Sequence, residues 1–177
     1  MTIFVPCDPT EMEKAVFAAA EIDGPVYIRV ARPVCEDITT EDTPFIPGKA
    51  NILKDGNDVC IITMGLMVPI ALKAAEMLEA EGISAAVVNM HTVKPIDAET
   101  ILAMNEKCKG IVTAEEHSVI GGLGSAVAEV LAGHAGAKFE RVGIQDKFGK
   151  SGKPDELFAA YGLTAENIVE KCKATLA

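Results

Sequence analysis

Three ionisable residues stand together just before a glycine-rich loop. They are Glu115, Glu116 and His117, and the glycines are Gly121, Gly122 and Gly124. Carboxylates in this position can accept hydrogen bonds from the free N–H groups of a helix start, or take part in acid–base chemistry. Because no nucleophile or partner base is apparent nearby in the sequence, the pattern favours capping or an interface contact over catalysis.

The glycine loop itself lies between a predicted strand and a predicted helix, where backbone N–H groups can bind a phosphate. The dinucleotide-binding form of this loop requires another glycine at position 127, which is valine here. No acidic residue about 20 positions later is well placed to hold a ribose. The loop therefore favours close packing of a helix on a sheet over nucleotide binding.

Two arginines, Arg29 and Arg32, lie at the end of the first predicted strand, Val26–Val30. Open α/β folds bind ligands at the carboxyl ends of their strands, and a guanidinium can hold a phosphate through two parallel hydrogen bonds. Residue type alone favours a solvated arginine or a salt bridge, so the sequence by itself does not assign these side chains to a ligand.

Alternating strand and helix patterns position these residues. A helix is predicted at 12–21, before the first strand. Further strands are predicted at 59–64, 85–90, 110–114 and 139–144, with helices at 68–81, 97–107 and 124–132 and two short helices after Lys153 and Leu163. This order predicts an α/β fold with a three-layer, open, mostly parallel sheet covered by helices on both faces, as in Rossmann-like proteins. Residues 38–55 lack a sustained period and are interpreted as a linker.

The amino-acid composition limits the classes of partner that we expect the chain to bind. The chain has 16 basic and 26 acidic side chains, a formal charge of −10, which repels nucleic-acid phosphates and anionic lipid surfaces. No apolar run approaches the about 20 residues of a membrane span, and no signal segment is evident, so we expect a cytoplasmic protein. The five cysteines are widely spaced without a CxxC pair, which predicts free thiols and no metal site.

Four sequence blocks, in order, resemble the transketolase family. They are Gly24–Pro33 (GPVYIRVARP), Thr92–Asp97 (TVKPID), Thr113–His117 (TAEEH) with the glycine loop after it, and Phe148–Leu157 (FGKSGKPDEL). The blocks span essentially the whole chain, so the resemblance is more specific than any single motif. It implies a C-terminal fragment in which residues 1–37 end the pyrimidine-binding domain, 38–55 form a linker and 56–177 form the complete C-terminal domain.

The resemblance implies an enzyme that transfers a two-carbon ketol unit between sugar phosphates of the pentose phosphate pathway, with thiamine diphosphate and Mg²⁺ as cofactors. The family's phosphate-binding arginine falls on Arg32, with Arg29 as a supporting residue, although Ala31 replaces the family's serine. The family's cofactor-binding segments are missing from this sequence. We therefore expect no cofactor site in this chain and no activity from it alone.

The implied partners are the rest of the transketolase polypeptide, or a separate N-terminal subunit, and a second copy in a homodimer. Two related enzymes share this domain, namely 1-deoxyxylulose 5-phosphate synthase and the β subunit of 2-oxoacid dehydrogenases. The segment Ser151–Pro154 favours transketolase over both. A different class of function, a non-catalytic regulatory or dimerisation module, is the remaining alternative.

Overall fold

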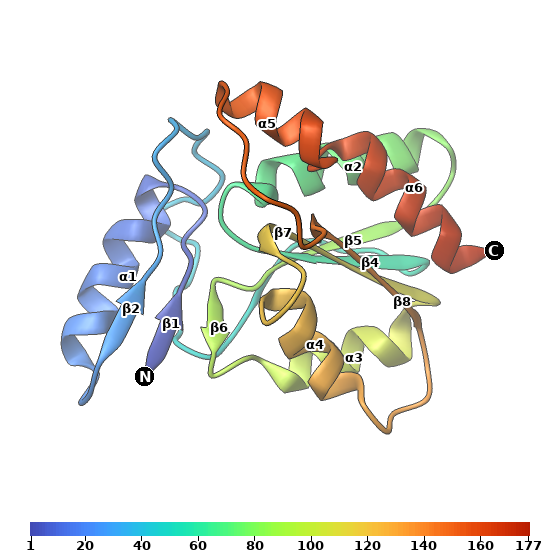
Figure 1. Cartoon of the computed structure of the whole chain (residues 1–177). Coiled ribbons are helices and arrows are strands. Elements are labelled where there is room, and N and C mark those ends of the chain that lie inside the picture. Colours follow the sequence, from blue (N-terminus) through green and yellow to red (C-terminus); the bar gives the residue numbers. More distant parts are fainter.

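The computed structural model describes residues 1–177 and contains two sheets of unequal size (Figure 1). The smaller is three-stranded, with the order β2-β1-β6. Its strands are β1 (Thr2–Phe4), β2 (Val26–Ile28) and β6 (Thr92–Lys94). Strand β1 pairs parallel with β2 and antiparallel with β6, so a strand from the middle of the sequence completes the N-terminal sheet.

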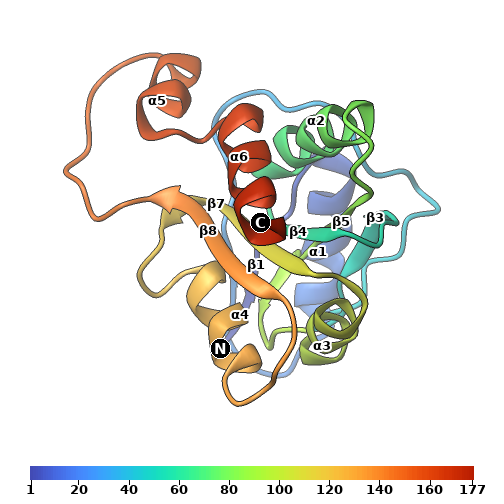
Figure 2. The ribbon, with the colours of Figure 1, turned by 90° about the vertical axis from the view of Figure 1, so that its right-hand side faces the viewer.

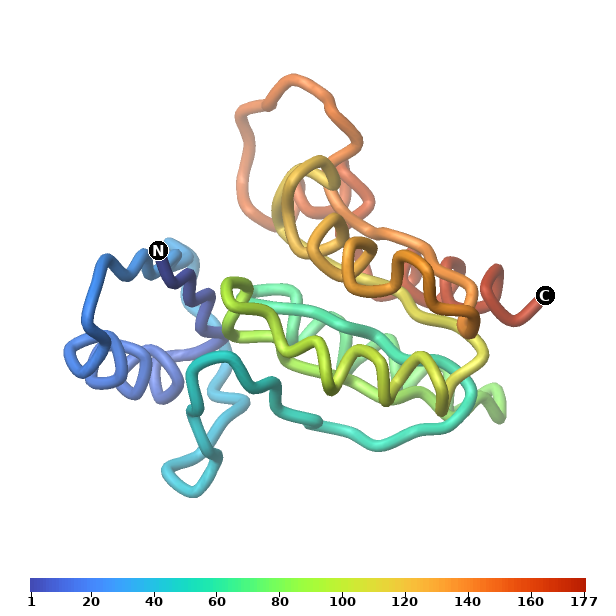
Figure 3. Tube along the Cα trace, turned by 90° about the horizontal axis from the view of Figure 1, so that it is seen from below, coloured from blue at the N-terminus to red at the C-terminus, as the bar shows by residue number.

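Helix α1 (Pro9–Glu21) connects β1 to β2. It begins at Asp8, whose carboxylate accepts a hydrogen bond from the Glu11 N–H at 2.7 Å, with Pro9 at the first helical position. Figures 1 and 3 show α1, β1 and β2 together at one side of the larger sheet. We refer to residues 1–37 as the N-terminal unit.

The larger sheet is five-stranded, with the order β3-β5-β4-β7-β8. Its strands are β3 (Asn51–Lys54), β4 (Val59–Thr63), β5 (Ala85–Asn89), β7 (Gly110–Ser118) and β8 (Lys138–Ile144). All neighbouring pairs are parallel except β3 with β5. Every residue of β4 and β5 is buried, as expected for central parallel strands that are covered on both faces.

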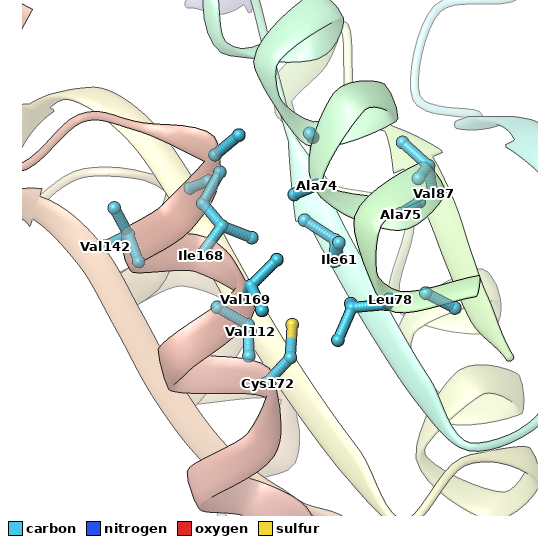
Figure 4. Packing of buried hydrophobic residues seen from close by; sticks show 14 of the residues in the cluster. Ile61, Ala74, Ala75, Leu78, Val87, Val112, Val142, Ile168, Val169 and Cys172 are labelled. Atoms are coloured by element: carbon cyan, nitrogen blue, oxygen red, sulfur yellow. The ribbon is translucent and has the colours of Figure 1, made fainter. Parts of the chain in front are cut away.

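Helices cover both faces of this sheet (Figure 2). One face carries α2 (Met67–Ala80) and α6 (Ala165–Leu176), with α5 (Pro154–Tyr161) beside them, and the other carries α3 (Ala98–Lys107) and α4 (Leu123–Leu131). Alternate β4 residues divide between the layers: Ile61 faces α2 and α6, as Figure 4 shows, whereas Ile62 joins the cluster of α3 and α4. This alternation gives the domain two cores.

Residues 38–50 lead from the N-terminal unit to β3 and are held by side chains at the start of α1, within α1 and at the start of α3. The Asp8 carboxylate accepts hydrogen bonds from the Ile38 and Thr39 N–H groups, and Lys14 donates to three carbonyl oxygens of the same segment. At the other end, Asp97 accepts from the Ala50 N–H at 2.9 Å. The segment is therefore attached to the fold along its length.

The structure confirms the predicted α/β class, with a mostly parallel sheet between two layers of helices. Three short strands are absent from the sequence prediction: β1, β6 and β3, the last lying within the predicted linker. Each has three or four residues, too few to show an alternating pattern in the sequence, and each is recognised only from its pairing with a neighbouring strand. None of the helices is both long and apolar enough to cross a membrane.

Candidate functional site

The N-terminal unit meets the large sheet where β2 and β7 end. The Arg29 guanidinium donates to the Glu116 carbonyl oxygen at 2.7 Å and to a Glu116 carboxylate oxygen at 3.1 Å. Both side chains are partly buried, with 26% and 31% of their surface exposed. The predicted supporting arginine is thus used in a contact between the two sheets, and its charge is neutralised there.

Arg32 lies three residues further along and lines an open cavity of about 660 Å³. We call this the Arg32 cavity. Its walls are formed by Arg32, Pro33, Glu116, Ile144, Gly152, Lys153, Pro154, Leu157, Phe158, Tyr161 and Leu163. Figure 1 shows the two segments that supply part of this lining, the chain after β2 and the segment that leads into α5. Arg32 is exposed and forms no hydrogen bond or ion pair with the rest of the chain, so its guanidinium is available to a ligand.

Glu115, the residue before Glu116, faces the opposite way and is fully buried. Its carboxylate accepts hydrogen bonds from the Leu123 N–H at 2.7 Å and the Gly124 N–H at 2.9 Å, at the start of α4. Burial raises the pKa of Glu115, and these two hydrogen bonds oppose the shift. The Leu123 and Gly124 N–H groups, which a phosphate would need as donors, already donate to this carboxylate. The anion-binding position of the glycine loop is therefore taken by Glu115.

The glycines of this loop serve close packing. A Cβ atom on Gly122 would lie 1.9 Å from a Glu115 carboxylate oxygen, and one on Gly124 would lie 2.7 Å from the Arg141 side chain. Gly121 has a φ of +74°, in the left-handed region that favours glycine. His117 is exposed, with Nδ1 3.9 Å from Glu115 Oε2 and 2.9 Å from the Ser118 carbonyl oxygen. The Glu115 carboxylate beside it is already engaged by the Leu123 and Gly124 N–H groups.

Sequence reasoning missed a buried polar cluster between the N-terminal unit and β5. Glu11 contributes a carboxylate to it, and one oxygen accepts from the Cys7 N–H at 2.8 Å, just before its own helix. The other oxygen accepts from Asn89 Nδ2 at 2.8 Å. The side chain of Glu11 is buried, which raises its pKa. Asn89 carries no signal in the sequence, because only the fold brings it beside Glu11.

Lys153 is the other residue that sequence reasoning did not single out as a site. It follows Gly152 at the start of α5 and lines the Arg32 cavity. From the sequence, a lysine among polar residues is interpreted as an ordinary solvated side chain. Only the fold, which brings the start of α5 close to the N-terminal unit, places Lys153 in the same cavity as Arg32. The motif that contains it contributed to the family resemblance but pointed to no chemistry.

A metal site is not formed by these residues. The chain contains no group of three or more histidine, cysteine, aspartate or glutamate side chains close enough together to hold an ion. The exposed guanidinium of Arg32 is of a type that can bind an anion, and it lies where the N-terminal unit meets the strand ends of the larger sheet.

Sequence comparison identifies the family to which this α/β domain belongs. The model of the family described as the transketolase C-terminal domain matches residues 48–168. This chain belongs to the transketolase C-terminal domain family. The matched region begins just before β3 and includes the whole five-stranded sheet.

Relatives give the same result. The 6-deoxy-6-sulfo-D-fructose transketolase subunit of Clostridium sp. (strain MSTE9) is 46% identical over 169 residues, covering 96% of this chain and 52% of the relative. A putative transketolase C-terminal section of Methanocaldococcus jannaschii is 46% identical over 175 residues, covering 97% and 54%. The chain thus spans about half the length of these curated relatives.

A solved structure of a split-gene transketolase, in an inactive beta4 tetramer, superposes with a TM-score of 0.96 and 48% identity, covering 99% of this chain and 58% of that chain. A 1-deoxy-D-xylulose-5-phosphate synthase of Symbiobacterium thermophilum is 35% identical over 179 residues, with 99% of this chain and 28% of the synthase covered. The resemblance to the C-terminal part of transketolase is confirmed.

Proposed function

We propose that this chain is the C-terminal part of a thiamine-diphosphate-dependent transketolase that transfers a two-carbon ketol unit between sugar phosphates of the pentose phosphate pathway. Family membership and relatives named as transketolase subunits support the reaction class. The observation that carries the substrate class is the free guanidinium of Arg32 at the edge of an open cavity, in a chain whose formal charge is −10. Arg32 binds the terminal phosphate of the sugar.

Arg29 supports this role indirectly. Its ion pair with Glu116 neutralises the carboxylate that faces the Arg32 cavity, which would otherwise repel a phosphate. The same contact fixes the end of β2 against β7, so the backbone that carries Arg32 is held in place three residues later. A phosphate bound far from the reacting carbons contributes binding energy that positions the sugar for reaction.

The cofactors belong to other parts of the enzyme in this proposal. The rest of the transketolase polypeptide, or a separate N-terminal subunit, binds thiamine diphosphate and Mg²⁺, and the assembled enzyme is a cytoplasmic homodimer. When bound there, thiamine diphosphate supplies the carbanion-stabilising chemistry. The chain described here contributes assembly contacts and the phosphate contact, and is inactive by itself.

A 1-deoxyxylulose 5-phosphate synthase is the second candidate, because members of that group align with nearly the whole chain. The two activities use different donors, a ketose phosphate for transketolase and pyruvate for the synthase. Assaying the assembled enzyme with each donor and a common aldose phosphate acceptor separates them. Transketolase activity requires turnover with the ketose phosphate donor and none with pyruvate.

The substitution Arg32→Ala tests the phosphate contact. In the enzyme assembled from this chain and its complementary polypeptide, kcat/KM for phosphorylated substrates should fall by about 30- to 1000-fold, which corresponds to about 2–4 kcal/mol of lost charge-assisted hydrogen bonding. Unphosphorylated sugars should be nearly unaffected. Lys150→Ala, which removes an exposed charge outside the Arg32 cavity, is the control. An equal loss for both substrate types would refute the role.

A further inference from the structure

A second cationic side chain lines the Arg32 cavity. Lys153, at the start of α5, is among its lining residues, and its side chain is exposed. The Lys153 ammonium forms no ion pair within the chain. Four other lysines of residues 56–177, here called the large domain, do form one, as Lys171 does with Glu140. The Lys153 backbone is fixed, because its N–H donates to Glu156 Oε2 at 3.2 Å.

The charges around the Arg32 cavity are unbalanced. Arg32 and Lys153 supply two positive charges, and the single carboxylate in the lining, that of Glu116, is already paired with Arg29. The lining itself therefore carries a positive balance, and the nearest further carboxylates are those of Asp155 and Glu156 in the first turn of α5. A phosphate monoester carries a charge of about −1.5 to −2 at neutral pH, which two cations can match.

The remaining walls strengthen such an interaction. Ile144, Leu157, Phe158 and Leu163 provide apolar surface, and charges interact more strongly beside apolar groups than in open water. The Tyr161 hydroxyl is already engaged, donating to the Phe148 carbonyl oxygen at 2.8 Å. That bond ties the loop before α5 to the helix, so the loop that carries Lys153 is anchored at both ends.

We propose that Lys153 is a second anion-binding residue, so that the terminal phosphate of the sugar lies between Arg32 of the N-terminal unit and Lys153 of the large domain. This inference rests on the proposed function and deepens it. The phosphate then bridges the two units of the chain, and α5 contributes to the recognition of phosphorylated substrates. The Arg32 guanidinium supplies a planar, bidentate hydrogen-bonding contact, whereas the Lys153 ammonium supplies a point charge.

The test is a titration of the isotope-labelled full chain, followed by NMR, with three probes: inorganic phosphate, a pentose phosphate and the corresponding unphosphorylated pentose. Four proteins are compared, namely the unmodified chain, Lys153→Ala, Arg32→Ala and Lys150→Ala. Lys150 is the matched control, because it is an exposed lysine of the same loop that lies outside the lining of the Arg32 cavity. The spectra themselves report whether each variant is folded.

We expect both phosphate probes to shift the N–H signals of residues around Arg32 and Lys153 in the unmodified chain, and the unphosphorylated pentose to shift none. Lys153→Ala should raise the Kd for phosphate about tenfold, whereas Lys150→Ala should change it less than about twofold. Equal effects of the two lysine variants would overturn the role of Lys153.

The two proposals fail in different ways. If Arg32→Ala abolishes phosphate binding and Lys153→Ala leaves it unchanged, the proposed function stands and the role of Lys153 is wrong. If neither substitution alters binding, or if the unmodified chain shows no shift at these residues, both proposals are wrong. If only Lys153→Ala weakens binding, the assignment of the phosphate to Arg32 is wrong.

Discussion

The Arg29 guanidinium and the Glu116 side chain, 87 positions apart in the sequence, form an ion pair of 3.1 Å that joins the small sheet to the large one. The pair has two components, since Arg29 also donates to the Glu116 carbonyl oxygen at 2.7 Å. Both side chains remain about one quarter to one third exposed, so solvent screens the charge–charge component. The hydrogen bond to the backbone does not depend on the Glu116 carboxylate.

Arg29→Ala should therefore destabilise the chain more than Glu116→Ala. We expect about 1–2 kcal/mol for the arginine substitution and less than about 1 kcal/mol for the glutamate substitution, because only the former removes both bonds. Urea unfolding of the two single variants and the double variant measures this. A coupling energy above about 1 kcal/mol would show that the ion pair, not the backbone bond, dominates the contact.

Gly122→Ala tests the capping of α4 by Glu115. The new methyl group would meet the Glu115 carboxylate at 1.9 Å and displace it from the Leu123 and Gly124 N–H groups. Loss of two hydrogen bonds to a buried charge should lower the free energy of unfolding by about 2–4 kcal/mol.

Gly149→Ala is the control for that substitution, because a Cβ atom there meets nothing within 4 Å and its φ lies outside the left-handed region. It should change the stability by less than about 0.5 kcal/mol. Thermal or urea unfolding compares the two variants, and a Gly122→Ala protein as stable as the control would show that the carboxylate can leave the helix start at little cost.

The helices and strands of the larger sheet could be predicted from the sequence because most are long enough to show a pattern and have recognisable start or stop residues. Strand β4 is apolar up to its last residue, and Thr164 caps the start of α6, where its side chain accepts from the Asn167 N–H. The short strands could not be found in this way. Strand β6 has only the residues Thr92–Lys94, and its pairing with β1 depends on contacts between segments far apart in the sequence.

The same distinction applies to the site. Arg32 could be singled out because it follows a strand and matches a family segment. Lys153 and the Glu11–Asn89 contact could not, since each becomes meaningful only when distant segments meet. For the glycine loop, the valine at position 127 favoured close packing over phosphate binding, and in the structure Glu115 accepts from the Leu123 and Gly124 N–H groups.

Glu11→Gln should make the stability less dependent on pH. The pKa of Glu11 is raised in the folded chain, chiefly by burial, so its contribution to stability is fully present below the unfolded pKa and is lost as pH rises through the higher folded value. A neutral glutamine has no such loss. The variant should therefore gain stability relative to the unmodified chain as pH increases from about 4 to about 7.

Glutamine should fit the cluster because the Asn89 carbonyl oxygen has no hydrogen-bond partner in the structure. After a flip of the Asn89 amide, the amide introduced by Glu11→Gln can donate to that oxygen while its own oxygen accepts from the Cys7 N–H. Glu11→Ala, in contrast, should cost about 2–4 kcal/mol at all pH values, since it leaves both donors unpaired. Unfolding curves between about pH 4 and pH 8 test both variants. A pH-independent difference between Glu11→Gln and the unmodified chain would assign the pH dependence to other groups.

Calorimetric titration of thiamine diphosphate with Mg²⁺ is the most direct test of the account as a whole, performed on this chain alone and on its mixture with the complementary transketolase polypeptide. A ketol-transfer assay is run on the same samples. The account predicts no binding heat and no turnover for the chain alone, and saturable binding with sugar-phosphate turnover for the mixture. Saturable cofactor binding by the chain alone would contradict it, as would a mixture that binds the cofactor but never transfers a ketol unit.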